Sequence, residues 1–176
     1  MSVLILSCSL NPASNSRLLA KAAAEACEKE GIPAIFADLR DYPLPLCDGA
    51  GAYGDPNVSR LGGLIKKARG IILATPIYNY DANAAAKNAI ELTGRAWEDK
   101  VVAFLCAAGG QGSYMSIMGL ANNLMLDFRC VIVPRFVYTT DAAFDDHGVT
   151  DGKVRDRVHR LVAELHSLCA CRPQGG

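Results

Sequence analysis

The chain has 176 residues, of which 51% are hydrophobic and 20% are charged. This length predicts a single domain, residues 1–176, that buries a substantial core. Lysine plus arginine and aspartate plus glutamate balance at 18 each, so the charge gives no basic footprint for nucleic acid or for an anionic membrane. No apolar run reaches the roughly 20 residues that a membrane-spanning helix needs.

The seven cysteines indicate a reducing compartment, because no pair has C-x-x-C spacing and several lie inside apolar runs. Cys106 and Cys130 are expected to be small core residues. Cys169 and Cys171 are expected to be more accessible, and only His166 lies near them, so no metal site is predicted. The first seven residues lack a cationic segment, so we expect no signal peptide and a cytoplasmic location.

Strand-like and helix-like segments alternate along the whole chain, as judged from apolar runs, helical apolar stripes and turn residues. In chain order they are a strand at Val3–Leu6, a helix at Arg17–Glu30, a strand at Pro33–Asp38, a helix at Asn57–Lys67, a strand at Gly70–Ala74, a helix at Ala84–Leu92, a strand at Val101–Ala107, a helix at Tyr114–Leu126, a strand at Cys130–Val133 and a helix at Lys153–Leu168.

This alternation predicts an α/β fold with a five-stranded parallel sheet and helices on both faces. Continuous Val/Ile/Leu runs are typical of strands that are buried on both faces. Ligands bind such sheets at the carboxyl ends of the strands. Three loops of unusual composition fall at those ends, at residues 7–16, 75–83 and 107–113.

The first loop joins a strand to a helix and is rich in hydroxyl and amide side chains. These are Ser7, Ser9, Asn11, Ser14, Asn15 and Ser16. A helix N-terminus offers unpaired N–H groups and a partial positive charge, which together suit a phosphate. Ordinary helix capping is the alternative, but one cap needs only one such residue. The loop therefore favours a phosphate site.

The second loop contains Pro76, Tyr78, Asn79 and Tyr80. Tyrosine rings and a carboxamide supply the apolar face and polar edge that a planar heterocycle requires, although the tyrosines could also simply cover the core. The third loop, AAGGQGS, is rich in glycine, which lets the backbone approach a ligand closely.

Together these segments resemble the NADPH-dependent FMN reductase family of flavodoxin-like proteins. The first loop matches that family's Gly-Ser…Ser-x-Ser/Thr-Arg sequence through Cys8, Ser9, Ser14, Ser16 and Arg17, with Cys8 in place of the usual glycine. The second matches its Thr-Pro-x-Tyr-Asn motif and the Lys-Asn pair that follows, through Thr75, Pro76, Tyr78, Asn79, Lys87 and Asn88. The third contains a similar pair, Gly109 and Gly110.

The resemblance covers roughly residues 3–168 and implies a flavodoxin-like three-layer sandwich with strand order 2-1-3-4-5. It implies that the FMN phosphate is held by Ser9, Asn11, Ser14, Asn15 and Ser16. It also implies that Pro76, Ile77, Tyr78 and Asn79 flank the flavin ring, and that Gly109, Gly110 and Gln111 meet its pyrimidine edge. A homodimer or homotetramer is expected, because subunit interfaces commonly help to close the flavin site in this family.

The implied activity is electron transfer from NADPH or NADH, by hydride delivery to the bound FMN, to a small-molecule acceptor such as free flavin, a quinone or an azo dye. No side-chain acid, base or nucleophile is required, so no catalytic residue is predicted. Two alternatives stay open: a flavodoxin-type electron carrier, which the zero formal charge disfavours, and a non-catalytic flavin-binding module.

Overall fold

The computed structural model describes residues 2–171. The strands of the main sheet are β1 (Val3–Ser7), β2 (Ala34–Asp38), β3 (Gly70–Tyr78), β4 (Asp81–Ala82), β5 (Val101–Ala108), β6 (Val131–Ile132) and β7 (Val137–Thr140). The α-helices are α1 (Asn15–Lys29), α2 (Pro56–Lys67), α3 (Ala84–Thr93), α4 (Met118–Phe128) and α5 (Gly152–Cys171). A small hairpin, β8 (Phe144–Asp145) and β9 (Gly148–Val149), precedes α5.

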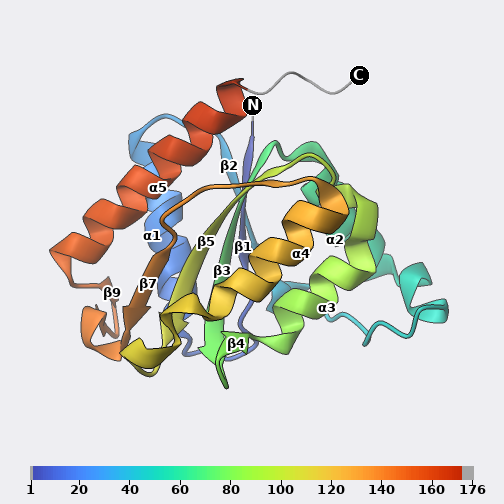
Figure 1. Ribbon diagram of the computed structural model, residues 1–176, viewed down its shortest axis with the longest axis horizontal. Coiled ribbons are helices and arrows are strands. Elements are labelled where there is room, and N and C mark those ends of the chain that lie inside the picture. The colour runs from blue at the N-terminus through green and yellow to red at the C-terminus, as the bar shows by residue number, and fades with distance from the viewer. Residues whose placement is uncertain (1, 172–176) are drawn as a thin grey trace.

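The sheet is sandwiched between two layers of helices (Figure 1), with α1 and α5 on one face and α2, α3 and α4 on the other. Its strand order is β2-β1-β3-β5-β6, and all of these pairs are parallel. β7 also pairs with β5 in parallel, farther along that strand. The predicted three-layer α/β fold is therefore confirmed. The predicted order 2-1-3-4-5 holds when β5 is counted as the fourth strand and β6 and β7 together as the fifth, since β4 pairs only with β3 off this path.

The apolar run of β3 is continuous because its alternate side chains serve two separate cores. Ile71 and Leu73 pack in the cluster beneath α2, α3 and α4, whereas Ile72 and Ala74 pack in the cluster beneath α1 and α5. All four side chains are fully buried. This two-sided burial is what the uninterrupted Val/Ile/Leu runs indicate in a parallel sheet.

The fifth strand differs from the sequence prediction. Instead of one strand over residues 130–133, the structure has two short pieces, β6 and β7, separated by residues 133–136, which include Pro134 and Arg135. Proline has no N–H for the ladder, and Arg135 takes a left-handed φ of 59°, so the chain leaves the sheet and rejoins it. β7, which was not predicted, extends this side of the sheet as far as the carboxyl end of β5.

Two further elements begin or end elsewhere than predicted. β3 continues to Tyr78 and turns back into β4, where the sequence indicated an open loop from residue 75. The helix expected from Tyr114 starts instead as a 3-10 segment, η4 (Gln111–Ile117), and becomes α-helical at Met118. Tyr114 in η4 stacks on Phe136 with 4.9 Å between ring centroids, which ties this segment to the strand region beside it.

No disulfide joins any of the seven cysteines, all of which lie within residues 2–171. Cys106 and Cys130 are buried as predicted, and Cys171 is exposed, but Cys169 is buried on the inner face of α5, contrary to expectation. Within residues 2–171, no helix is long and apolar enough to cross a membrane, and no cluster of three potential metal ligands occurs in the same described region.

Candidate functional site: a cavity at the carboxyl ends of β1, β3 and β5

The three loops predicted from the sequence converge on one cavity. It lies at the carboxyl ends of β1, β3 and β5, near β4 at the lower edge of the view in Figure 1. Its volume is about 620 Å³, within the range of pockets that hold cofactors. It is lined by Asn11, Ala13, Ser14, Asn15, Ser16, Pro76, Ile77, Tyr78, Asn79, Ala107, Ala108, Gly109 and Asp141.

The N-terminus of α1 opens into this cavity without a side-chain cap. Ser14 occupies the N-cap position, but its hydroxyl makes no capping bond and instead lies 2.8 Å from the hydroxyl of Ser16. By contrast, Asp55 caps α2 by accepting from the backbone N–H of Asn57, and Asn83 caps α3 by accepting from that of Ala86. The N–H of Arg17 bonds back to the carbonyl oxygen of Ser14 at 3.1 Å. The first-turn N–H groups of Asn15 and Ser16, which no side chain caps, are therefore left for an acceptor from outside the helix.

Side chains around that helix end add further donors. Asn15 Nδ2 donates to Asp141 Oδ1 at 2.9 Å, and the two serine hydroxyls lie beside it on the cavity wall. With the partial positive charge of the helix end, this set suits a phosphate group without any lysine or arginine on the wall. Asn11 is held by its backbone N–H, which donates to Ser9 Oγ at 3.2 Å.

Asn83 joins the first loop to the second, and sequence reasoning missed this. Its Nδ2 donates to the carbonyl oxygen of Cys8 at 2.8 Å, and its Oδ1 accepts from Thr75 Oγ1 at 2.9 Å. The side chain is buried, with 6% of its surface exposed. The available signal was an asparagine immediately before an Ala-rich helix, which is a common N-cap.

The second loop is a tight hairpin. Tyr78 pairs with Asp81, so Asn79 and Tyr80 form a two-residue turn, and both have left-handed φ angles, 51° and 67°. Such turns match the twist of the flanking strands. Asparagine tolerates this conformation, but a tyrosine there carries strain. The turn leaves the rings of Tyr78 and Tyr80 exposed, by 53% and 60%, at the mouth of the site.

Tyr138, on β7, holds the third loop. Its hydroxyl donates to the carbonyl oxygen of Gly110 and lies 2.8 Å from the hydroxyl of Ser113. The ring is buried and meets Tyr114 edge-on, with 5.5 Å between centroids. A Cβ atom added to Gly109 or Gly110 would meet no other atom within 4 Å, so a planar group has room to approach this backbone.

The structure brings most of the predicted site residues together. Nine of them line the cavity, namely Asn11, Ser14, Asn15, Ser16, Pro76, Ile77, Tyr78, Asn79 and Gly109. Ser9 lies beneath the wall and is buried, whereas Gly110 and Gln111 are exposed beyond its rim. Four further residues line the cavity and were not predicted as site residues, namely Ala13, Ala107, Ala108 and Asp141.

Residues 1–145 match the family model described as NADPH-dependent FMN reductase. The chain belongs to the NADPH-dependent FMN reductase family. It is accordingly an NAD(P)H-dependent oxidoreductase that uses FMN, and the resemblance of its three motifs to this family is confirmed.

Relatives and solved structures agree with this family. The chain is 30% identical to an NAD(P)H:quinone oxidoreductase of Solanum tuberosum, over 91% of this chain and 88% of that protein. It is 29% identical to a probable NADPH:quinone oxidoreductase of Oryza sativa subsp. japonica, over 98% and 90%. The fold matches that of a flavoenzyme NAD(P)H:(acceptor) oxidoreductase from Paracoccus denitrificans with a TM-score of 0.75 at 24% identity, covering 94% of this chain and 97% of that one.

Cys8 replaces the glycine that is usual in the FMN reductase family, and the backbone tolerates it. No left-handed φ occurs at Cys8, so its conformation does not require glycine. The side chain is fully buried, and its Sγ donates to the carbonyl oxygen of Leu6. Burial, with a smaller contribution from Asp38, raises the pKa of this thiol far above its ordinary range, so Cys8 stays protonated and is no nucleophile.

Three other motif residues of the FMN reductase family lie outside the cavity wall. Arg17 Nε binds Asp38 Oδ2 at 2.7 Å. Lys87 pairs with Glu91 on the surface of α3 at 2.6 Å. Asn88 bonds to the backbone of Pro45 and Cys47. In this structure these residues support neighbouring segments.

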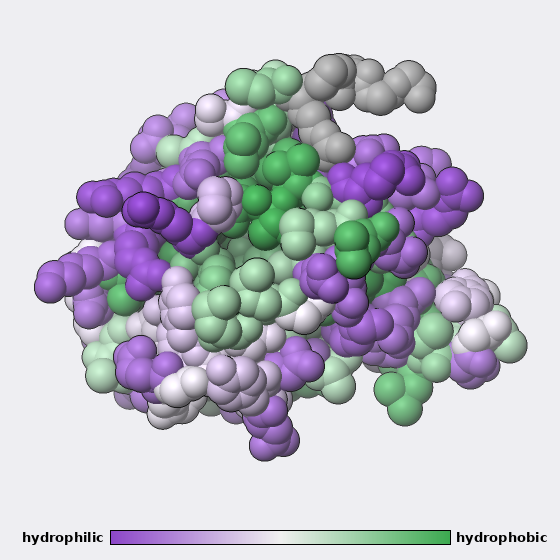
Figure 2. All heavy atoms as spheres, viewed as in Figure 1, coloured by the Kyte–Doolittle hydropathy of each residue, from purple (hydrophilic) through white to green (hydrophobic). Residues whose placement is uncertain are grey.

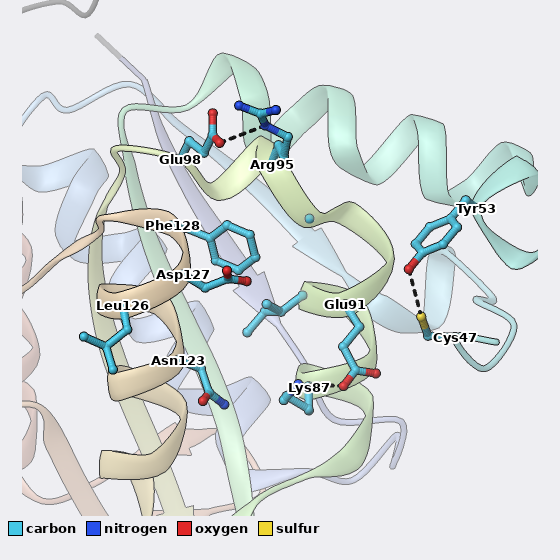
Figure 3. A pocket seen from close by; sticks show the side chains of 12 residues that line it. Cys47, Tyr53, Lys87, Glu91, Arg95, Glu98, Asn123, Leu126, Asp127 and Phe128 are labelled. Atoms are coloured by element: carbon cyan, nitrogen blue, oxygen red, sulfur yellow. Dashed lines mark hydrogen bonds and ion pairs between the residues drawn. The ribbon is translucent and has the colours of Figure 1, made fainter. Parts of the chain in front are cut away.

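A separate cavity of about 690 Å³ lies between α3 and α4, away from the strand ends. Figure 3 shows two ion pairs among its charged side chains, Lys87 with Glu91 and Arg95 with Glu98, and the carboxylate of Asp127 on the α4 side. Tyr53 and Cys47 meet at its far side, with 3.6 Å between Oη and Sγ. No α-helix N-terminus lies among its described lining residues, in contrast to the cavity that α1 enters.

Proposed function

We propose that the protein passes electrons from NAD(P)H to a quinone, a free flavin or a similar small acceptor, using FMN held in the cavity at the ends of β1, β3 and β5. The observation that carries this is the uncapped N-terminus of α1, which opens into the cavity beside the β3–β4 hairpin. The names of the relatives support the acceptor class: they include quinone oxidoreductases and an NADPH azoreductase of Bacillus sp. (strain OY1-2).

The predicted site residues have distinct proposed roles. Asn11, Ser14, Asn15 and Ser16, with the N–H groups of the first turn of α1, bind the phosphate. Ser9 supports them from below by accepting from the N–H of Asn11. Bound FMN supplies the two-electron chemistry, which the protein directs by position and electrostatics.

The ring-binding half of the site would use mainly backbone. A rigid floor for a planar group is formed by the last three residues of β3, Pro76, Ile77 and Tyr78, and by Asn79, which follows them. Gly109, Gly110 and Gln111 supply N–H groups with open space above the two glycines. Among the lining residues that the structure describes, Asp141 is the only carboxylate, and it already accepts from Asn15, so we assign no acid or base.

The test is a titration of the purified protein with FMN, followed by NADPH and NADH under nitrogen and then a quinone. We expect binding that quenches FMN fluorescence, loss of the yellow colour on addition of either nucleotide, and recovery of the colour with the quinone. A protein that binds no FMN, or that binds FMN but never bleaches with either nucleotide, would contradict the proposal.

The same titration separates the two alternatives. An electron carrier of flavodoxin type would be reduced by a partner reductase but not directly by NAD(P)H. A non-catalytic flavin-binding module would bind FMN and resist both donors. The formal charge of zero supports the enzyme, because a carrier usually relies on an acidic surface to find its partner.

We also propose a homodimer or homotetramer that assembles through the outer face of α4. Hydrophobic side chains gather there and on the segment that follows (Figure 2), including Met118, Met125, Leu126 and Val131. Leu126 is 77% exposed, and exposed apolar patches commonly mark interaction sites. Light scattering after size exclusion should give a multimeric mass for the wild type and a lower mass for Leu126→Glu. An unchanged mass would exclude this face.

The chain is further proposed to form one domain, residues 1–176, in the cytoplasm. Seven cysteines without a disulfide among the described residues support a reducing compartment. Cell fractionation would test the location, and limited proteolysis would test the domain, since one domain should resist cleavage between its elements.

A further inference from the structure

A second cavity adjoins the proposed FMN site and has different chemistry. Its volume is about 660 Å³, and it lies between the first loop, the segment after β2 and the start of α3. It is lined by Leu10, Leu39, Arg40, Tyr42, Pro43, Leu44, Leu46, Ala84, Ala85 and Asn88. Leu10 and Leu46 are 60% and 82% exposed, so two large apolar side chains surround the opening without being covered.

The walls of this cavity are fixed by specific contacts. Asn88 Oδ1 accepts from the N–H of Cys47 at 2.9 Å, and its Nδ2 donates to the carbonyl oxygen of Pro45 at 2.9 Å. The guanidinium of Arg60 lies over the ring of Tyr42, 5.0 Å from its centroid. A preformed pocket of this size, mostly apolar with a few placed polar groups, is typical of small-molecule sites.

One wall carries positive charge. The carboxylate of Asp38, 3% exposed, binds Arg17 at 2.7 Å and Arg40 at 2.8 Å. Two guanidinium groups therefore share one carboxylate, which leaves a charge of +1 on the cluster. Arg40 lines the cavity, and among the described residues its Nη1 has no hydrogen-bond partner. Asp41, the next acidic residue, also attracts the guanidinium of Arg40 electrostatically, but it is exposed, so solvent and salt screen its charge.

Neighbouring residues of the same segments line this cavity and the FMN cavity. Leu10 lines one and Asn11 lines the other. On the opposite side, Asn83 bonds to the first loop and Ala84, the next residue, lines the apolar cavity. A molecule that extends from the FMN cavity past the first loop or the start of α3 can thus place its other end here.

We propose that this cavity binds an aromatic ring that carries an anionic group, with the ring among Leu10, Tyr42 and Leu46 and the anion on Arg40. Two sources have this chemistry: the adenosine 2′-phosphate end of NADPH and an aromatic acceptor with a sulfonate or carboxylate. The assignment of the cavity as a subsite for the electron donor or acceptor rests on the proposed oxidoreductase function. Binding of an anionic aromatic molecule in the cavity does not depend on that function.

The experiment measures equilibrium binding of two probes, anthraquinone-2-sulfonate and adenosine 2′,5′-bisphosphate, to the FMN-loaded protein. It compares wild type with Arg40→Gln, which removes the positive group, and with Leu46→Asp, which places a negative charge at an exposed position of the rim. Arg160→Gln, an exposed arginine on α5, is the matched control. FMN affinity is measured for every variant by fluorescence quenching.

We expect at least one probe to bind and both cavity variants to weaken it about tenfold or more, as the loss of a charge-assisted contact predicts, with no change in Arg160→Gln. If the cavity variants weaken binding of the sulfonate alone, the cavity is assigned to the acceptor. If they weaken binding of the bisphosphate alone, it is assigned to NADPH. Absence of binding by both probes, or binding that neither cavity variant weakens, overturns the proposal. Failure of the wild type to take up FMN instead overturns the proposed function.

Discussion

Asn83 Nδ2 and the carbonyl oxygen of Cys8 form a 2.8 Å hydrogen bond that connects the end of β1 to the start of α3. The same carboxamide accepts from Thr75 and caps α3 through Ala86. One buried side chain thus fixes the relative position of the segment proposed to bind phosphate and the segment proposed to bind the flavin ring.

Replacement of this asparagine should weaken both the fold and the site. Asn83→Ala removes a cap, which typically contributes about 1 kcal/mol, and leaves the hydroxyl of Thr75 with fewer partners, so we expect a loss of about 2–3 kcal/mol in unfolding free energy. FMN affinity should fall about tenfold or more. Thermal unfolding and fluorescence titration measure the two effects. Glu164→Ala, at an exposed position of α5, is the control and should change neither.

Ser14 distinguishes phosphate binding from helix capping. Because its hydroxyl makes no capping bond and lies against that of Ser16, Ser14→Ala should cost the FMN-free protein only about 0.5 kcal/mol for that contact, whereas Asp55→Ala, at the capped α2, should cost about 1 kcal/mol. Ser14→Ala should still weaken FMN binding. Riboflavin, which lacks the phosphate, should bind equally to the wild type and to Ser14→Ala. A stability loss equal to that of Asp55→Ala would favour capping.

Tyr138 should act on the site through the third loop. Tyr138→Phe keeps the buried ring but removes the bonds to Gly110 and Ser113, so we expect about 1 kcal/mol less stability and several-fold weaker FMN binding. Tyr114→Phe is a matched control, because Tyr114 contributes only ring contacts. Equal FMN affinity in the two variants would show that the hydroxyl of Tyr138 does not position the loop.

Tyr80 should trade stability for activity. Its left-handed φ of 67° costs about 1 kcal/mol in a residue other than glycine, so Tyr80→Gly should raise the unfolding free energy by up to that amount. Loss of the exposed ring at the mouth of the site should lower kcat/KM for NAD(P)H. Steady-state kinetics and chemical denaturation are the measurements. A variant that is both less stable and fully active would contradict this account of the turn.

Asp38 should make stability depend on pH in the acid range. Burial opposes its ionisation, but hydrogen bonds from Arg40 and Arg17 outweigh burial and lower its pKa below the ordinary value of 3.8. The stabilisation is therefore complete above that value and is lost as the pH falls through the lower, folded pKa. Asp38→Asn should reduce stability by about 1–3 kcal/mol at neutral pH, and the difference from wild type should shrink below about pH 4. A difference that stays constant to pH 2 would contradict the assigned ion pairs.

The sheet and the position of the site were predictable because they follow from local patterns. Two-sided burial produces the apolar runs of β3 and β5, and the order of strands and helices places their carboxyl ends together. The serines and asparagines of the first loop and the Thr75–Asn79 motif could be recognised directly. These features depend on short stretches of chain.

The supporting contacts were not predictable from those patterns. Asn83 and Cys8 are 75 positions apart, and Tyr138 reaches Gly110 across 28. β7 was missed because it consists of four residues after a proline, too few to show a period. The left-handed turn at Tyr80 departs from residue preference, so only the pairing of β3 with β4 reveals it.

The division of the fifth strand also affects how the sheet meets other molecules. A long, flat edge strand invites pairing with the edges of neighbouring chains and hence aggregation. On this side the edge is two short pieces interrupted by Pro134, which cannot template a continuous ladder. The opposite edge, β2, is an unbroken strand whose Ile35 and Phe36 are exposed. If partly unfolded chains associate, they should therefore do so through the β2 edge. The substitution Ile35→Lys should suppress this association.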